Sequence, residues 1–131
     1  MLSRSDLVHL NVLLKMTNKE INDHFTAKLF SELYVSHPVP INFEITDEKD
    51  TKEVKVYSMR FLKENNYLKF EWASNGYFDV RFTDRGLALL ELPSEGGDEK
   101  VGESLVTAIK DGSISVAAGI LSHILITGAT N

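Results

Sequence analysis

The sequence predicts an α+β protein, on the strength of two periodic patterns in the chain. Two stretches, 39–45 and 67–83, alternate apolar and polar side chains, which is typical of half-buried strands. The segments around them carry apolar residues every three or four positions, which is typical of amphipathic helices. With 131 residues, of which 43% are hydrophobic, the chain has enough apolar side chain for one core without disulfides.

The first third of the chain is predicted to be helical. A first helix covers about residues 3–16, and a second begins where Thr17 and Glu20 have the spacing of a capping box. The second helix should end before the His-Pro pair at 37–38, because proline disfavours a helical conformation at the preceding residue. Leucines recur at helical spacing in the first helix: Leu7, Leu10, Leu13 and Leu14.

Residues 39–45 alternate strictly and predict a strand with one apolar face. Pro40 cannot donate a ladder hydrogen bond, which favours the start of a strand or the edge of a sheet. A polar connector at 46–50 then leads to a helix over about 51–65.

The helix at 51–65 divides into two sides when it is projected at about 100° per residue. One side is expected to face the core and the other to form an exposed basic ridge. The inward side carries Val54, Tyr57, Ser58 and Phe61. The ridge carries Lys52, Lys55, Met59 and Lys63, with Arg60 on its shoulder.

Residues 67–83 predict a β-hairpin. A two-residue Asn75-Gly76 loop would turn the apolar residues of the second strand to the wrong face. A three-residue loop, 74–76, avoids this and requires Gly76 in the left-handed conformation. The pairs it predicts are Trp72 with Phe78, Phe70 with Val80, and Leu68 with Phe82, leaving Lys69, Glu71, Asp79 and Arg81 on the solvated face.

The C-terminal half predicts a short helix over about 84–90, capped by Thr83 or Asp84, and then a helical pair. We divide the chain into a domain at 1–92, a linker at 93–97 and a C-terminal helical pair at 98–131. The last helix is apolar nearly all round, so it must be buried in the domain, buried in an oligomer, or laid on a partner or on a membrane surface. As a candidate homodimer interface it offers Ile114, Ala117, Leu121, Ile124 and Leu125.

About forty residues resemble the winged helix-turn-helix superfamily. The segment Leu62–Leu68 resembles the end of a recognition helix, and Thr83–Leu90 has the Thr-x-x-Gly-x-x-Leu-Leu pattern that follows the wing hairpin. The whole chain also resembles small winged-helix-like proteins of prophages and mobile elements. The resemblance implies a winged-helix-like core of helices and a three-stranded antiparallel sheet, with a C-terminal helical extension. The sequence departs from the family at 45–49, which is too short for the helix that normally precedes the recognition helix.

This resemblance implies a small DNA-binding, transcription-regulator-like protein that places the helix 51–65 in a major groove. Duplex DNA is then the expected partner. The chain carries a net charge of −5, but residues 49–86 hold eight basic and six acidic side chains and are mildly basic. The residues expected to contact DNA are Lys52, Lys55, Met59, Arg60, Lys63, Lys69 and Arg81.

The alternative is an acidic protein-binding module, such as an immunity or antitoxin-like protein that neutralises a basic partner. The net charge of −5 and a pI near 5.3 favour it, because acidic surfaces attract basic partners.

Several classes of site have no support in the sequence. Cysteine is absent, and the four histidines have no metal-like spacing, so we expect no metal site. Without a P-loop, a G-x-S-x-G or a G-x-G-x-x-G motif, we expect neither an enzyme nor a cofactor. The longest apolar stretch, 114–126, is shorter than the about 20 residues a membrane-spanning helix needs. Together with a poor secretory signal, these features predict a cytoplasmic protein.

Overall fold

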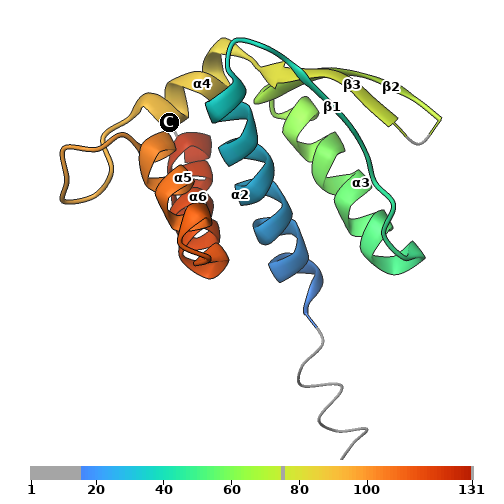
Figure 1. Cartoon of the computed structure of the whole chain (residues 1–131), viewed down its shortest axis with the longest axis horizontal. Helices are drawn as coiled ribbons and strands as arrows, with labels where there is room; N and C mark the ends of the chain where they lie inside the picture. The colour runs from blue at the N-terminus through green and yellow to red at the C-terminus, as the bar shows by residue number, and fades with distance from the viewer. Residues whose placement is uncertain (1–15, 75, 131) are drawn as a thin grey trace, which may run out of the picture.

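The computed structural model describes residues 16–74 and 76–130, with side chains as far as residue 125. This part of the chain forms five helices and one three-stranded antiparallel sheet, which confirms the α+β class (Figure 1). The first predicted helix, at 3–16, lies outside the described residues except for Met16, which is not helical. In chain order the elements are α2 (Asn18–Ser36), β1 (Ile41–Glu44), α3 (Lys49–Glu64), β2 (Leu68–Ala73), β3 (Gly76–Phe82), α4 (Asp84–Glu91), α5 (Val101–Lys110) and α6 (Ile114–Thr130).

Helix α2 is the central helix, with α3 on one side and the α5–α6 pair on the other (Figure 1). Its start confirms the predicted capping box: the Thr17 hydroxyl accepts the Glu20 N–H at 3.1 Å, and the Glu20 carboxylate accepts the Thr17 N–H at 3.3 Å. It ends at Ser36, before the His-Pro pair, as predicted. Phe30 is fully buried and meets Phe82 edge to face, with ring centroids 5.2 Å apart, which joins α2 to the sheet.

The sheet has the strand order β1-β3-β2, so β3 is its central strand. Strand β1 is shorter than predicted, because Val39, Pro40 and Ile45 make no ladder pairs. Residues 45–48 connect β1 directly to α3 without an intervening helix.

The hairpin differs from its predicted register. Ala73 pairs with Gly76, so the loop has two residues, 74–75, and not three. Gly76 belongs to β3 and does not have the left-handed backbone that was predicted for it. The predicted pair of Trp72 with Phe78 is therefore wrong, because Trp72 pairs with Tyr77. The pair of Leu68 with Phe82, at the base of the hairpin, is confirmed, and Phe70 lies opposite the irregular stretch of β3 that contains Val80.

Strand β3 has one extra residue at Asp79, where the register at the tip of the hairpin changes to the register at its base. Between the pairs Glu71–Phe78 and Lys69–Arg81, β3 contains one residue more than β2, which defines a β-bulge. Asp79 has a left-handed φ of 52°, and its N–H donates to the Asn42 side-chain oxygen of β1 at 2.9 Å. The bulge corrects the face mismatch that a two-residue loop would otherwise cause.

The bulge decides which aromatic side chains are buried. Tyr77 is 3% exposed and Val80 fully buried, on either side of the bulge. Phe78, which the three-residue loop would place inward, is 43% exposed instead. Trp72 lies on the same side of β2 as the buried Leu68 and Phe70, and it is 61% exposed near the tip of the hairpin.

The end of the hairpin is joined to the turn after α3 by Thr83 and Gly86. The Thr83 hydroxyl donates to the Asn66 carbonyl at 2.6 Å and accepts the Gly86 N–H at 3.0 Å, which caps α4 as predicted. The Thr83 N–H donates to the Tyr67 carbonyl at 3.0 Å. A Cβ on Gly86 would lie 2.1 Å from that carbonyl oxygen, so only glycine allows this close approach.

Helices α5 and α6 belong to the same buried cluster as α2 and the sheet. Leu105 of α5 and Leu121 of α6 are each at most 1% exposed. The segment predicted as a linker, 93–97, is part of a closed loop in which Pro93 pairs with Lys100. One continuous core therefore includes the C-terminal helices.

We expect Gly86→Ala to lower the free energy of unfolding by at least about 2 kcal/mol, because the new methyl group must displace backbone rather than a mobile side chain. Gly119→Ala is the matched control: it lies in α6, where a new methyl group would have open space within 4 Å, so it should be neutral or stabilise by up to about 1 kcal/mol. Urea unfolding measures both. Equal stability of the two variants would contradict the described junction.

Candidate nucleic-acid interface

The orientation of α3 differs from the predicted one. Ser58, Met59 and Leu62 are its buried residues, and Met59 has no exposed surface. Tyr57 and Phe61, predicted to face the core, are 55% and 50% exposed. The helix has two apolar stripes, and the stripe that contains Met59 and Leu62 is the one that enters the core.

The prediction that Met59 and Lys55 belong to an exposed basic ridge is therefore wrong. Met59 cannot contact DNA, because it lies in the core. The Lys55 ammonium forms a 3.0 Å ion pair with Asp47 and lies over the Phe25 ring, and its side chain is only 24% exposed. Lys52 is half-buried, so no continuous exposed ridge of lysines exists along this side of α3.

The remaining predicted cations come together between α3 and the hairpin. Lys69 and Arg81 are cross-strand neighbours on β2 and β3, and Lys63 faces them from the last turn of α3. The three side chains line a hollow of about 370 Å³, which we call the basic hollow. Its other lining residues are Asn66, Leu68, Phe70 and Glu71.

The cations of the basic hollow have no anionic partner among the described residues. Every described ion pair lies elsewhere, and none of Lys63, Lys69 and Arg81 has a described carboxylate within 4.0 Å. Lys63 lies over the Phe70 ring at 5.0 Å from its centroid, and Arg81 donates to the Asp79 carbonyl. The positive charge of the hollow is therefore available to an external anion.

An aromatic cluster adjoins the basic hollow. Trp72 stacks on Tyr77 with centroids 6.4 Å apart and planes at 16°, and Phe70 meets Tyr77 edge to face. Arg60 and Lys63 flank these rings around a smaller cavity of about 190 Å³. Sequence reasoning missed Trp72 as a surface residue, because alternation predicts the face of a strand but not how far the core extends along it.

Arg60 and Tyr77 line the same small cavity, so the charge of Arg60 acts on the Tyr77 hydroxyl. Burial raises the pKa of the Tyr77 hydroxyl above its ordinary value, while the positive charge of Arg60 acts in the opposite direction. Arg60 also lies over the Tyr57 ring, with its guanidinium 5.0 Å from the centroid.

The structure also corrects the prediction that α6 offers a homodimer interface. Ala117 and Leu121 are buried against the rest of the same chain, at 0% and 1% exposure, so they are inaccessible to a second copy. Ile114, Ile124 and Leu125 are partly buried and pack against the same core. The chain itself thus covers much of the described part of α6, while Val116 remains exposed.

The described part of the chain lacks two other kinds of feature. It contains no group of three or more acidic, histidine or cysteine side chains that could hold a metal ion. Among the described helices, none combines the length and the apolarity needed to cross a bilayer.

Comparison with known proteins finds no match: no family model fits the chain, and no curated protein and no solved structure is similar to it.

We expect Arg60→Gln to raise the pKa of Tyr77 further, because it removes a positive charge that favours the phenolate. NMR titration of the Tyr77 ring carbons measures this change, with Lys110→Gln on α5 as the control of equal charge. A pKa that stays the same or falls in Arg60→Gln would contradict the placement of Arg60 beside Tyr77.

Proposed function

We propose that this protein is a non-enzymatic DNA-binding protein of winged-helix type that contacts duplex DNA through the basic hollow. The observation that carries the proposal is the convergence of Lys63, Lys69 and Arg81 with no described carboxylate within 4.0 Å. The element order of helix, strand, helix and hairpin is compatible with the winged-helix resemblance of the sequence. A role in transcription regulation and a cytoplasmic location go with this proposal.

The hairpin, rather than the exposed side of α3, is the main contact in this proposal. The exposed side of α3 carries Glu53 and Glu64, which would repel phosphates. The basic hollow instead presents three cations from three different elements, α3, β2 and β3. Lysine and arginine contacts to phosphates position a protein on DNA without selecting a base sequence.

Trp72 extends the contact surface beyond the phosphates. Trp72 is 61% exposed, lines the smaller cavity together with Arg60 and Lys63, and stacks on Tyr77. An aromatic ring in this position can pack on sugars or on unstacked bases at the edge of a groove. The net charge of −5 opposes long-range attraction, so the affinity should be modest and depend on salt.

We expect binding to a random-sequence 20-base-pair duplex to weaken as salt rises. Three phosphate contacts give a slope of about −2.7 for log K against log salt, at about −0.9 per contact. Changing Lys63, Lys69 and Arg81 together to glutamine should bring the slope close to zero. Fluorescence anisotropy of the labelled duplex measures the slope.

The matched control changes three exposed lysines elsewhere, Lys28, Lys49 and Lys110, to glutamine. It removes the same charge from the molecule and should keep the slope of the unmodified protein. If both triple variants lost the salt dependence equally, net charge alone would determine DNA binding, and the basic hollow would not be the contact site. Absence of binding at 50 mM salt would exclude DNA as the partner.

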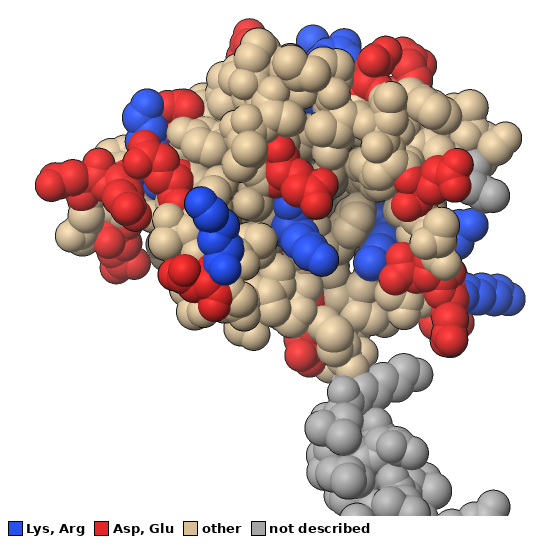
Figure 2. Space-filling model, viewed as in Figure 1, with Lys and Arg blue, Asp and Glu red and all other residues tan. Residues whose placement is uncertain are grey.

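A second candidate function is supported by the loop between α4 and α5. Figure 2 shows acidic side chains gathered over this loop, which protrudes at the left of the view. Glu95, Asp98 and Glu99 are all exposed there. We infer that this surface is the one that would bind a basic protein, as an immunity or antitoxin-like protein does. Replacing these three residues with their amides would weaken such a complex and leave DNA binding unchanged or stronger.

A further inference from the structure

The smaller cavity beside the basic hollow has an aromatic wall and a cationic rim. It measures about 190 Å³, and the rings of Phe70, Trp72 and Tyr77 line it together with Arg60 and Lys63. We call it the aromatic cavity. Lys63 and Phe70 also line the basic hollow, so the two cavities adjoin.

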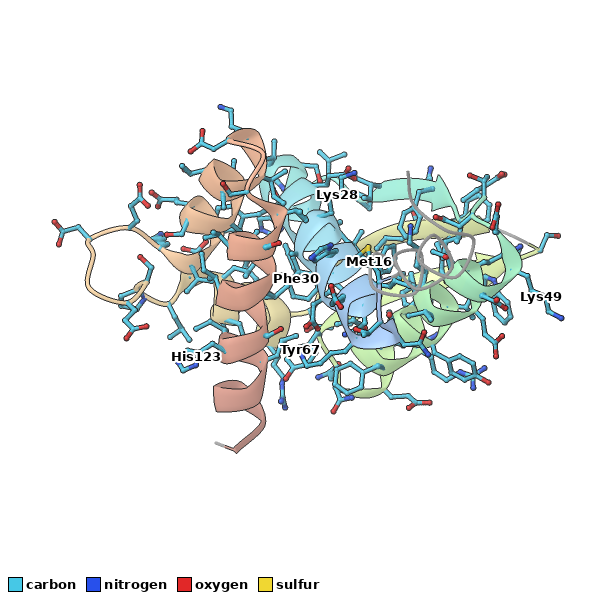
Figure 3. All side chains as sticks on the ribbon, turned by 90° about the horizontal axis from the view of Figure 1, so that it is seen from below. Met16, Lys28, Phe30, Lys49, Tyr67 and His123 are labelled. Atoms are coloured by element: carbon cyan, nitrogen blue, oxygen red, sulfur yellow. The ribbon has the colours of Figure 1, made fainter. Side chains whose placement is uncertain are left out.

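Both cavities lie where α3 meets the hairpin, because α3 and β2 pack against each other. In Figure 3, which views the molecule from below, Lys49 marks the start of α3, Tyr67 marks the connection after its end, and the hairpin lies beyond the helix. Arg60 and Lys63 belong to the last two turns of α3. The short connection therefore brings their charges beside the aromatic side chains of the hairpin.

The aromatic wall is a rigid surface for a flat ligand. Tyr77 is 3% exposed, stacks on Trp72 and meets Phe70 edge to face, with centroids 5.2 Å apart. Trp72 is 61% exposed, so much of its ring remains open. Rings that the fold already holds in place lose little conformational freedom when a ligand stacks on them. These features indicate a planar aromatic ligand.

The Tyr77 hydroxyl adds a polar group to this wall. It forms no hydrogen bond with a described residue, although no described buried side-chain oxygen or nitrogen is left without a partner, so the hydroxyl reaches the surface. Arg60, which lines the same cavity, acts on the pKa of this hydroxyl. The hydroxyl can therefore donate to, or accept from, a polar edge of a bound ring.

The cations determine the charge of the ligand. An aromatic box can hold an ammonium group through cation–π contacts, but Arg60 and Lys63 would repel one here. Neither has a described carboxylate within 4.0 Å, and Lys69 and Arg81 continue the positive charge into the basic hollow. The ligand therefore combines a planar ring with an anionic group, as a nucleotide does.

The size of the aromatic cavity restricts it to a single ring system. Sites that bury a drug-sized ligand measure about 300–1,000 Å³, and this cavity measures about 190 Å³. A base pair inside a duplex is covered by its neighbours on both faces and offers no free face to the wall. A base must leave the stack to enter, which costs least where it is already unpaired.

We propose that the aromatic cavity binds one unpaired nucleobase while the basic hollow holds the adjoining phosphates, so that the preferred ligand is duplex DNA with a single-stranded overhang. This inference rests on the proposed function, because it requires DNA at the basic hollow. The base stacks on Trp72 and meets the Tyr77 hydroxyl at its edge. Lys63, which lines both cavities, contacts the phosphate between the base and the duplex.

Fluorescence anisotropy with three labelled probes tests the proposal on the full chain. The first probe is a blunt 20-base-pair duplex, and the second extends one strand by five thymidines at both ends. The third carries the same extensions with abasic sites in place of the thymines. Stacking of one base on an aromatic side chain strengthens binding at least about fivefold. We expect this gain for the thymidine probe over the blunt one, and its loss in the abasic probe, which keeps the added phosphates.

A pair of variants locates the base. Trp72→Ala should reduce the affinity for the thymidine probe to that for the abasic probe, because the stacking surface is removed. Phe78→Ala is the matched control, since Phe78 is another exposed aromatic residue of the same hairpin and lines neither cavity. It should keep the full preference for the thymidine probe. Loss of the preference in both variants would overturn the proposal.

The probes also separate this inference from the proposed function. Equal affinity for the blunt and thymidine probes, or for the abasic and thymidine probes, would overturn the base site and leave duplex binding intact. Binding of the thymidine probe without binding of the blunt one would support the base site and contradict duplex binding. Absence of binding to all three probes would overturn both.

Discussion

The candidate interface depends on the β-bulge at Asp79 of β3. A hydrogen bond from the Asp79 N–H to the Asn42 side chain holds this bulge in place. It satisfies the backbone donor of a bulged residue that has left the ladder, and it connects the central strand to β1. Without the extra residue, the two-residue loop would continue its register to the base of the hairpin. Lys69 would then oppose Val80, and the apolar face of β3 would turn away from the core.

The same bulge sets which residues of β3 face the core. Tyr77 is buried there, and Trp72, its partner across the strands, lies on the same face near the hairpin tip, stacked on Tyr77 but exposed. The bulge also brings Lys69 opposite Arg81, where Lys63 of α3 can face them. A protein with a net charge of −5 thereby presents one local site at which cations outnumber carboxylates.

Local patterns predicted the elements, and long-range contacts decided their details. The capping box of α2 and the cap of α4 were predictable because both partners lie within four residues. The hairpin register was not, because the bulge is satisfied by Asn42, which is 37 positions away. Apolar alternation alone favoured the wrong loop, since it cannot distinguish a longer loop from a bulge.

For a similar reason, the sequence alone could not predict which side of α3 is buried or which surface covers α6. Helix α3 has two apolar stripes, and its neighbours determine which one is buried. The Ser58 hydroxyl of α3 donates a hydrogen bond to the Asn22 side chain of α2, and Met59 and Leu62 enter the core. The sequence required α6 to be covered, but only the packing of α2 and α5 shows that this chain itself covers much of it. Of the seven residues expected to contact DNA, the structure brings Lys63, Lys69 and Arg81 together at one site, with Arg60 at its border.

The most direct test of the account is the emission of Trp72, the single tryptophan of the chain, during titration with duplex DNA. If DNA contacts the basic hollow and the aromatic cluster that adjoins it, bound duplex should change the emission of Trp72, protect it from acrylamide quenching, and lose both effects when salt releases the DNA. Binding that leaves the emission and the quenching of Trp72 unchanged would contradict the account, because the DNA would then lie on another surface.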